Sequence, residues 1–183
     1  MTKLINNLQE IDDREGWVLA NIQSIKLRHN PLSDVTISPF IGLILRNSQN
    51  LKRLDLSFTS CHRPTFLIKA DRDLAIEKLL LTSTNVQGKD VVSFISRLPR
   101  LKYLGLGALG AGAGASLSML NSSAMTLSDN DLRALSDALL VTCPLLERVD
   151  LVQNTKLGLF NDMEDGLSSL AWAKVRFVGG GAR

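Results

Sequence analysis

The spacing of apolar residues constrains the fold of this chain more than any other feature. A leucine comb, Leu-x-x-Leu-x-Leu with Ile, Val or an aromatic residue at some positions, recurs along the chain. Its copies are Ile22/Ile25/Leu27, Leu51/Leu54/Leu56, Ile76/Leu79/Leu81, Leu101/Leu104/Leu106, Leu146/Val149/Leu151 and the weaker Trp172/Val175/Phe177. Their first positions are 29, 25, 25, 45 and 26 residues apart. Such a period is typical of arrays whose units bury their apolar faces only by stacking.

The comb predicts an α/β solenoid: a horseshoe arc with a parallel concave sheet, convex helices and about five to six repeats. Each copy forms a short strand, whose fourth and sixth positions point inward and whose third, fifth and seventh point outward. The ninth position turns the chain, and short polar side chains there can bond backbone groups that the strand leaves unpaired. The residues at this position are Asn30, Thr59, Thr84, Leu109 and Asn154.

Helices are expected to return the chain between strands. The first is predicted over 39–48, with Ser38 as N-cap and Pro39 at the first helical position. Others are predicted over 89–97 and 162–170, and only a short helix or turn between Thr59 and Ile76. A further helix is expected to begin at Ser128, with Asp131 completing a capping box. One face of that helix is predicted to carry Leu132, Leu135, Leu139 and Leu140.

The long interval in the comb indicates an insertion within one repeat. Residues 107–125 are rich in Gly and Ala, and removing about 20 residues restores the 25-residue period. We expect a mobile loop there, or a loop that grips a partner. The predicted organisation is an N-terminal capping segment at 1–21, a repeat domain at 22–178 and a flexible tail at 179–183.

Composition narrows the class of protein. The chain has 183 residues, enough for one domain, and its net charge of +3 is too small to predict nucleic-acid binding. No stretch reaches 18 consecutive apolar residues, and the first residues lack the apolar core of a secretory signal. Cys61 and Cys143 lie far apart in sequence without zinc or redox spacing, which favours reduced thiols. We therefore expect an intracellular protein, cytoplasmic or nuclear, without membrane contact.

Motifs for catalysis are lacking in the sequence. It has no phosphate-binding loop with its lysine, no His-Glu-x-x-His and no Gly-x-Ser-x-Gly. Gly110, Gly112 and Gly114 belong to the low-complexity segment. Cys61 and His62 are sequence neighbours, which favours a surface loop over a nucleophile and its base. We expect no enzymatic activity, no metal and no cofactor.

The outward positions of the comb nominate a partner-binding surface. Its candidate residues are Lys26, Arg28, Arg53, Asp55, Lys78, Leu80, Tyr103, Arg148 and Asp150. Adjacent strands lie ~4.8 Å apart, so the cations of the first three strands should form a modest basic patch. Tyr103 and Leu80 offer apolar anchors beside it. The partner expected is an acidic or mixed-charge protein segment; alternatively, these charges only keep an exposed sheet soluble.

The fifth comb copy and the residues before it resemble a known family. Leu-Ser-Asp-Asn-Asp-Leu at 127–132 and Cys-Pro-Leu-Leu-Glu-Arg-Val-Asp-Leu at 143–151 are similar to ribonuclease-inhibitor-like, cysteine-containing leucine-rich repeats. Residues 50–57 and 98–104 are similar too. The resemblance implies a non-enzymatic interaction module, and in F-box proteins the substrate-recognition part of a ubiquitin-ligase adaptor. Only one repeat carries the Cys-Pro pair, and an F-box would have to come from outside the roughly 20 residues before the first comb.

Two other functions fit the same architecture. Activators of small GTPases share the horseshoe, although no arginine here lies in a motif specific enough to carry that activity. A truncated repeat array without a partner of its own is the third interpretation. The identity of the partner, the pathway and the oligomeric state stay open.

Overall fold

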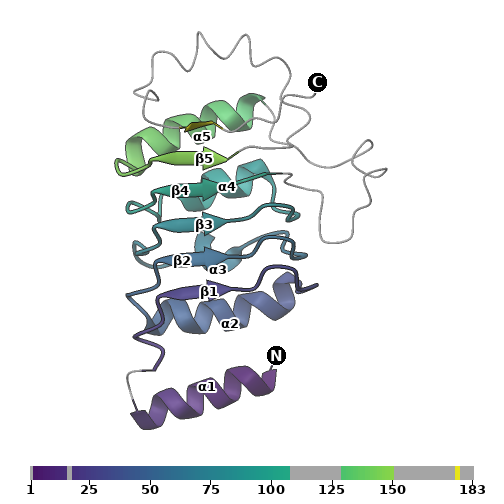
Figure 1. Cartoon of the computed structure of the whole chain (residues 1–183), viewed down its shortest axis with the longest axis vertical. Coiled ribbons are helices and arrows are strands. Elements are labelled where there is room, and N and C mark those ends of the chain that lie inside the picture. Colours follow the sequence, from purple (N-terminus) through teal and green to yellow (C-terminus); the bar gives the residue numbers. More distant parts are fainter. Residues whose placement is uncertain (1, 16–17, 108–128, 151–175, 178–183) are drawn as a thin grey trace.

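A computed structural model describes residues 2–15, 18–107, 129–150 and 176–177 of the chain. Short strands alternate with helices along most of this length (Figure 1). The elements are α1 (Thr2–Glu15), β1 (Ser24–Lys26), α2 (Asp34–Asn47), β2 (Arg53–Asp55), α3 (Thr65–Ile68), β3 (Lys78–Leu80), α4 (Gly88–Ile95), β4 (Tyr103–Gly105), α5 (Asp129–Thr142), β5 (Arg148–Asp150) and β6 (Arg176–Phe177). The chain is therefore an α/β protein.

The strands form one parallel sheet in chain order, β1 to β6. Equivalent comb positions pair directly, since Ile25 lies opposite Leu54, Leu54 opposite Leu79, and Leu79 opposite Leu104. The register predicted for the first five copies is thus confirmed, and the sheet is compatible with a stacked solenoid.

Backbone hydrogen bonds continue the pairing beyond the strands. At the start of β2, β3, β4 and β5, two successive amides share one carbonyl of the preceding repeat; Lys78 and the residue before it, for example, both donate to the Lys52 carbonyl. After the strands, His29 N donates to Ser57 O, Phe58 N to Thr82 O, and Ser83 N to Gly107 O. These bonds satisfy polar backbone groups at both ends of the strands, so they hold each repeat against the next.

The inward comb positions form the core. Leu54, Leu79 and Leu104 are fully buried. They pack in one cluster with apolar residues of the helices, among them Ile41 of α2 and Phe94 of α4. Helices α2 to α5 lie on the same side of the sheet (Figure 1). In the described part of the chain, no helix covers the opposite side, which we call the open face.

The turn prediction is confirmed for the described repeats. Thr59 Oγ1 donates to Leu56 O and Thr84 Oγ1 to Leu81 O, both at 2.7 Å, and Asn30 Nδ2 donates to Leu27 O at 3.0 Å. The residue before each has a positive φ: 59° at His29, 58° at Phe58 and 52° at Ser83. A side-chain bond at the ninth position thus accompanies a left-handed eighth residue. Leu109 and Asn154 lie outside the described residues.

The predicted start of the first helix is wrong. α2 begins at Asp34 after Ser33, not at Pro39 after Ser38, so Pro39 lies inside the helix. A proline there removes the amide that would donate to the carbonyl of Val35. Val35 is 86% exposed, so water can satisfy that carbonyl. The earlier start adds a turn that packs Ile37 into the core.

The phase of the sixth comb copy is also wrong. The sequence pattern places Val175 opposite Val149, but the structure pairs Phe177 with Val149 and Arg176 with Arg148. The slip is two residues, and a strand alternates with period two, so the apolar pattern looks the same in both registers. The hydrophobic pattern therefore could not detect it.

Other helix predictions have mixed outcomes. The short helix between Thr59 and Ile76 is confirmed by α3, and α4 lies within two residues of its predicted bounds. In α5, Leu135 and Leu139 are buried as expected, whereas Leu140 is 43% exposed. The prediction for Leu140 is wrong, because Leu140 directly follows Leu139 and its side chain therefore points away from the buried face of the helix. The Ser128 cap, most of the 107–125 insertion, the helix at 162–170 and the tail lie outside the described residues.

The N-terminal segment contributes a helix at the end of the stack. α1 lies against α2 (Figure 1), and Leu8 packs against the core from it. Leu19, just beyond this helix, is fully buried. Residues within 1–21 thus supply a helix next to α2 and a buried leucine in the core, and their capping role stays a prediction.

Candidate functional site

The open face is built from the outward comb positions of successive strands. Two rows cross it: the third-position row and the fifth-position row, defined by the register of the sheet. The third-position row runs Ser24, Arg53, Lys78, Tyr103, Arg148 and Arg176. The fifth-position row runs Lys26, Asp55, Leu80, Gly105 and Asp150. Arg176 belongs to this row by register and was not among the predicted residues, because outward positions were assigned only for the first five copies.

A tyrosine between two cations lies at the centre of the third-position row. Lys78 Nζ lies 4.2 Å from the centroid of the Tyr103 ring, and Arg148 Cζ lies 5.1 Å from it. Both distances permit cation–π attraction. The strands on either side of β4 supply these cations, so the sheet register itself assembles the group, which we call the Tyr103 cluster.

The hydroxyl of Tyr103 anchors the cluster to the fifth-position row. It donates to Asp150 Oδ2 at 3.3 Å. Partial burial raises the pKa of Tyr103, and the negative charge of Asp150 raises it further because both disfavour the phenolate. The phenol therefore stays neutral near physiological pH and keeps its donor role. The ring is half-buried, so part of its surface can still meet a partner.

Arginine and aspartate pair along single strands at both sides of the cluster. Arg53 Nη2 lies 3.6 Å from Asp55 Oδ2, and Arg148 Nη2 lies 3.6 Å from Asp150 Oδ2. Asp55 is only 1% exposed, unlike the exposed position expected from the comb, and its Oδ1 accepts the amide of Ser57. The predicted basic patch is thus partly neutralised from within. The Asp55 carboxylate is too buried for direct contact with another molecule.

Apolar residues lie between the Arg53–Asp55 pair and the Arg148–Asp150 pair. Leu80 is half-buried, and its side chain folds over Gly105 on the next strand. A Cβ atom placed on Gly105 would lie 2.8 Å from Leu80 Cδ2 and 3.5 Å from Tyr103 Cε1. The missing side chain of Gly105 therefore leaves the space that Leu80 occupies, and Tyr103 borders the same space. The predicted apolar anchors, Leu80 and Tyr103, are brought together.

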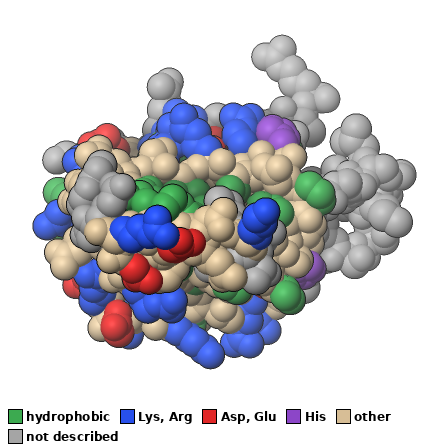
Figure 2. Space-filling model, turned by 90° about the horizontal axis from the view of Figure 1, so that it is seen from below, with side chains coloured by type: hydrophobic (Ala, Val, Ile, Leu, Met, Phe, Trp, Pro, Cys, Tyr) green, Lys and Arg blue, Asp and Glu red, His purple; other side chains and the backbone are tan. Residues whose placement is uncertain are grey.

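The β1 end of the face is polar and exposed. Lys26 lies opposite Asp55 in the register, and Arg28 Nη2 lies 3.0 Å from His29 Nε2. His29 stacks on Phe58 with ring centroids 4.4 Å apart. Phe58 was not among the predicted site residues. The sequence could have indicated it, because Phe58 is the eighth residue of its comb copy, as His29 is of the first. Viewed from the α1 end, basic side chains lie around the molecule and apolar ones form small separate areas (Figure 2).

The buried thiols do not form a reactive site. Cys61 is fully buried, which corrects the expected surface loop, while His62 beside it is exposed. Burial, with a further contribution from Asp34, raises the pKa of Cys61. Burial also raises the pKa of Cys143 to about 12, and its thiol donates to Leu98 O at 3.3 Å. Both thiols are free and stay protonated, hence weakly nucleophilic.

The described residues also lack two other kinds of feature. Within them, no three or more His, Cys, Asp and Glu side chains gather as metal ligands. None of the helices described combines the length and apolarity needed to cross a bilayer.

No family model matches the chain, and no curated protein matches it. The geometry of the open face is therefore the main guide to function.

Proposed function

We propose that this chain is a leucine-rich repeat solenoid of the ribonuclease-inhibitor-like class that binds a protein partner on its open face and has no enzymatic activity. Three observations support the class: the 25-residue comb, strands paired in chain order at equivalent positions, and the polar ninth-position turns. Stacked repeats of this kind present extended surfaces for binding.

The Tyr103 cluster is the single observation that supports a binding role. It places an aromatic ring between a lysine and an arginine, close to the aliphatic side chain of Leu80. Tyrosine and arginine are among the residue types that contribute most at interfaces. Surface charges kept only for solubility would not need an ordered ring between them. A partner that covers the cluster would exclude water from both cation–π contacts and strengthen them.

The paired charges define the chemistry of the partner. Arg53 beside the cluster and Arg148 within it are each paired with an aspartate two residues later. Lys78 has no ion pair within the described residues, and its ammonium lies over the Tyr103 ring. A partner segment of mixed charge, with a carboxylate for Lys78 and an apolar side chain for Leu80, fits this pattern better than a uniformly acidic one.

A narrower form of the proposal is the substrate-recognition part of a ubiquitin-ligase adaptor, acting inside the cell. The resemblance of the 127–151 unit to the repeats of F-box proteins supports it, and so does the burial of Cys143, the cysteine of that unit. An adaptor of this kind would hold its substrate on the open face while another segment or chain binds the ligase.

The test is binding of a displayed peptide library to the purified chain, with wild-type protein and matched variants. Lys78→Glu removes the cation over the Tyr103 ring, and we expect the selected peptides to bind about tenfold more weakly. Lys89→Glu, on exposed Lys89 of α4, changes the same charge on the helical side and should leave binding unchanged. Equal affinity of the Lys78→Glu variant and wild type would refute the assigned face.

Arg53 is a poor choice for such a charge reversal. Replacing it with Glu would leave buried Asp55 beside a second carboxylate, so loss of binding could reflect loss of folding. Tyr103→Phe is the better second variant, because it keeps the ring between the cations and removes only the hydroxyl bond to Asp150. We expect it to bind nearly as well as wild type.

A further inference from the structure

We propose that a hollow at the opposite edge of the repeats, between the end of α2 and the segments that enter β3 and β4, binds an extended acidic peptide segment. This hollow has a volume of about 680 Å³, within the size range of ligand sites. Its residues belong to strand-entry loops and a helix end, not to the open face. The inference therefore adds a second binding surface to the proposed function.

The hollow exists because the second repeat has almost no helix. α2 has 14 residues and α4 has 8, whereas α3 between them has only 4. The sequence after α3 reads Lys-Ala-Asp-Arg-Asp at 69–73, and aspartates at a helix C-terminus are unfavourable. The chain therefore leaves the helix early, and the volume that a longer helix would fill stays open.

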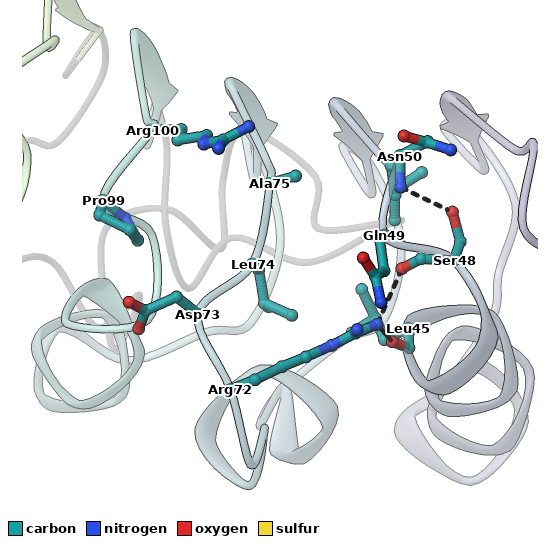
Figure 3. A pocket seen from close by; sticks show the side chains of 11 residues that line it. Leu45, Ser48, Gln49, Asn50, Arg72, Asp73, Leu74, Ala75, Pro99 and Arg100 are labelled. Carbon is teal, nitrogen blue, oxygen red and sulfur yellow. Dashed lines mark hydrogen bonds between the residues drawn. The ribbon is translucent and has the colours of Figure 1, made fainter.

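Arg72 forms one wall of the hollow and is held in place. It extends from the segment after α3 to the end of α2, as Figure 3 shows, where its Nη2 donates to Leu45 O at 2.7 Å and to Ser48 O at 3.0 Å. These bonds satisfy carbonyls that the helix end leaves open. One nitrogen of the guanidinium makes both bonds, so the remaining donors are left for a ligand.

Arg100 and Gln49 provide unpaired polar groups around an apolar floor. Within the described residues, neither the Arg100 guanidinium nor the Gln49 carboxamide makes a hydrogen bond or ion pair. Arg100 extends over Ala75, while the Asp73 carboxylate points away from Arg72 (Figure 3). Leu74 lies between the two arginines on the floor of the hollow. Arg72 and Arg100 line the hollow together with one carboxylate, Asp73, and Arg100 also interacts electrostatically with Glu77. The two guanidinium groups in the lining favour an anionic ligand by charge complementarity.

A second, smaller hollow extends this site beside α3. It has a volume of about 300 Å³ and shares Leu45 and Leu74 with the first, so the two hollows adjoin; we call the adjoining pair the trough. Its lining includes Arg46, Lys69 and Asp71, again two cations and one anion. The Ser38 hydroxyl, also in its lining, is buried and lacks a hydrogen-bond partner in the described structure. A cation-rich trough of two adjoining hollows favours an extended peptide over a compact ligand.

The test uses a short labelled peptide of alternating Glu and Leu, with the Gln/Leu counterpart as its neutral control. Fluorescence anisotropy measures affinity, and amide NMR shifts locate the site. We expect the acidic peptide to shift the amides of Gln49, Leu74 and Ala75. Arg100→Glu should weaken its binding by about tenfold, while Arg100→Lys retains most of it. Arg133→Glu changes an exposed arginine of α5 outside the trough and should have no effect.

Three results would overturn the inference. Equal binding of the Gln/Leu peptide would show that charge does not drive recognition. Equal losses from Arg100→Glu and Arg133→Glu would show non-specific attraction to a basic protein. Loss of binding in Lys78→Glu but not in Arg100→Glu would place the peptide on the open face, which contradicts the trough and supports the proposed function. Thermal melts of all variants check that each is folded.

Discussion

At the scale of single residues, the ninth-position turns show how one hydroxyl supports a repeat. Thr59 and Thr84 are both fully buried and occupy equivalent positions, yet the carbonyls that they bond differ. Leu81 O accepts both the hydroxyl and the amide of Thr84. In the described structure, Leu56 O accepts only the hydroxyl of Thr59. The two threonines are therefore not equally replaceable.

Thr59→Val should destabilise the protein more than Thr84→Val. The first substitution leaves a buried carbonyl without a donor, at a cost of about 1–3 kcal/mol, while the second removes one of two bonds and costs about 1 kcal/mol. Urea denaturation measures both free energies of unfolding. Thr82→Val, on the open face, is the matched control and should change stability little. Equal losses at positions 59 and 84 would contradict the unequal roles of the two hydroxyls.

Residue-level predictions from the sequence succeed where a repeat position fixes the environment. Asn30, Thr59 and Thr84 are polar residues at an equivalent turn, and their bonds follow from that position alone. The burial of Asp55 does not follow, since alternation along a strand assigns a face and not its exposure. Tyr103 was nominated, but its contacts with Lys78 and Arg148 depend on rotamers that the sequence pattern does not specify.

At the scale of elements, one carboxylate ties a helix to the neighbouring repeat. Asp34, the first residue of α2, accepts the amides of His62 and Arg63, each at 3.1 Å. These amides belong to the loop before α3, so the bond joins the start of one helix to the approach to the next. The carboxylate also lies at the positive end of the α2 dipole.

Asp34→Ala should destabilise the protein by about 1–2 kcal/mol, because two amides lose a charged acceptor that is partly exposed to solvent. Asp71→Ala removes an exposed carboxylate just after α3 and is the matched control, with little expected change. Urea denaturation gives the difference, and hydrogen exchange at the amides of His62 and Arg63 shows whether the loss is local. Unchanged exchange at both amides would contradict the assigned role of Asp34.

Strand positions were predictable because the apolar spacing of the comb fixes them. Helix starts were less predictable because their prediction relied on capping serines and a proline. The first five strands follow from apolar spacing. The start of α2 does not, because Ser33 and Ser38 are both plausible caps and Pro39 suggested the later one. The Arg72 contact with α2 was also beyond sequence reasoning, since it joins residues 24 and 27 positions apart through an irregular segment.

At the scale of the whole molecule, stability should vary with position in the stack. Leu79 of β3 is fully buried and lies between two neighbouring strands, whereas Ile25 of β1 has one neighbouring strand and is 7% exposed. In a stacked array each repeat gains its stability from the units beside it. The same inward comb position is therefore not equivalent at the end and at the centre.

Leu79→Ala should cost about 2–5 kcal/mol, and Ile25→Ala should fall at or below the low end of that range. The central site leaves a cavity enclosed by two repeats, while the end can relax. Thermal and urea unfolding measure both, and hydrogen exchange should show stronger protection for β3 than for α1. A larger loss from Ile25→Ala would mean that the β1 end, not the centre, limits stability.

The chain order of the strands has a consequence for how such a molecule can change in length. Each strand pairs only with the strands before and after it in sequence. A unit such as 52–76 could therefore be duplicated by recombination, and each copy would still pair with a neighbour of the same kind. Each added unit would lengthen the sheet by one inter-strand step, about 4.8 Å. Inheritance by whole modules would then alter the span of the open face while leaving the turns of every retained unit intact.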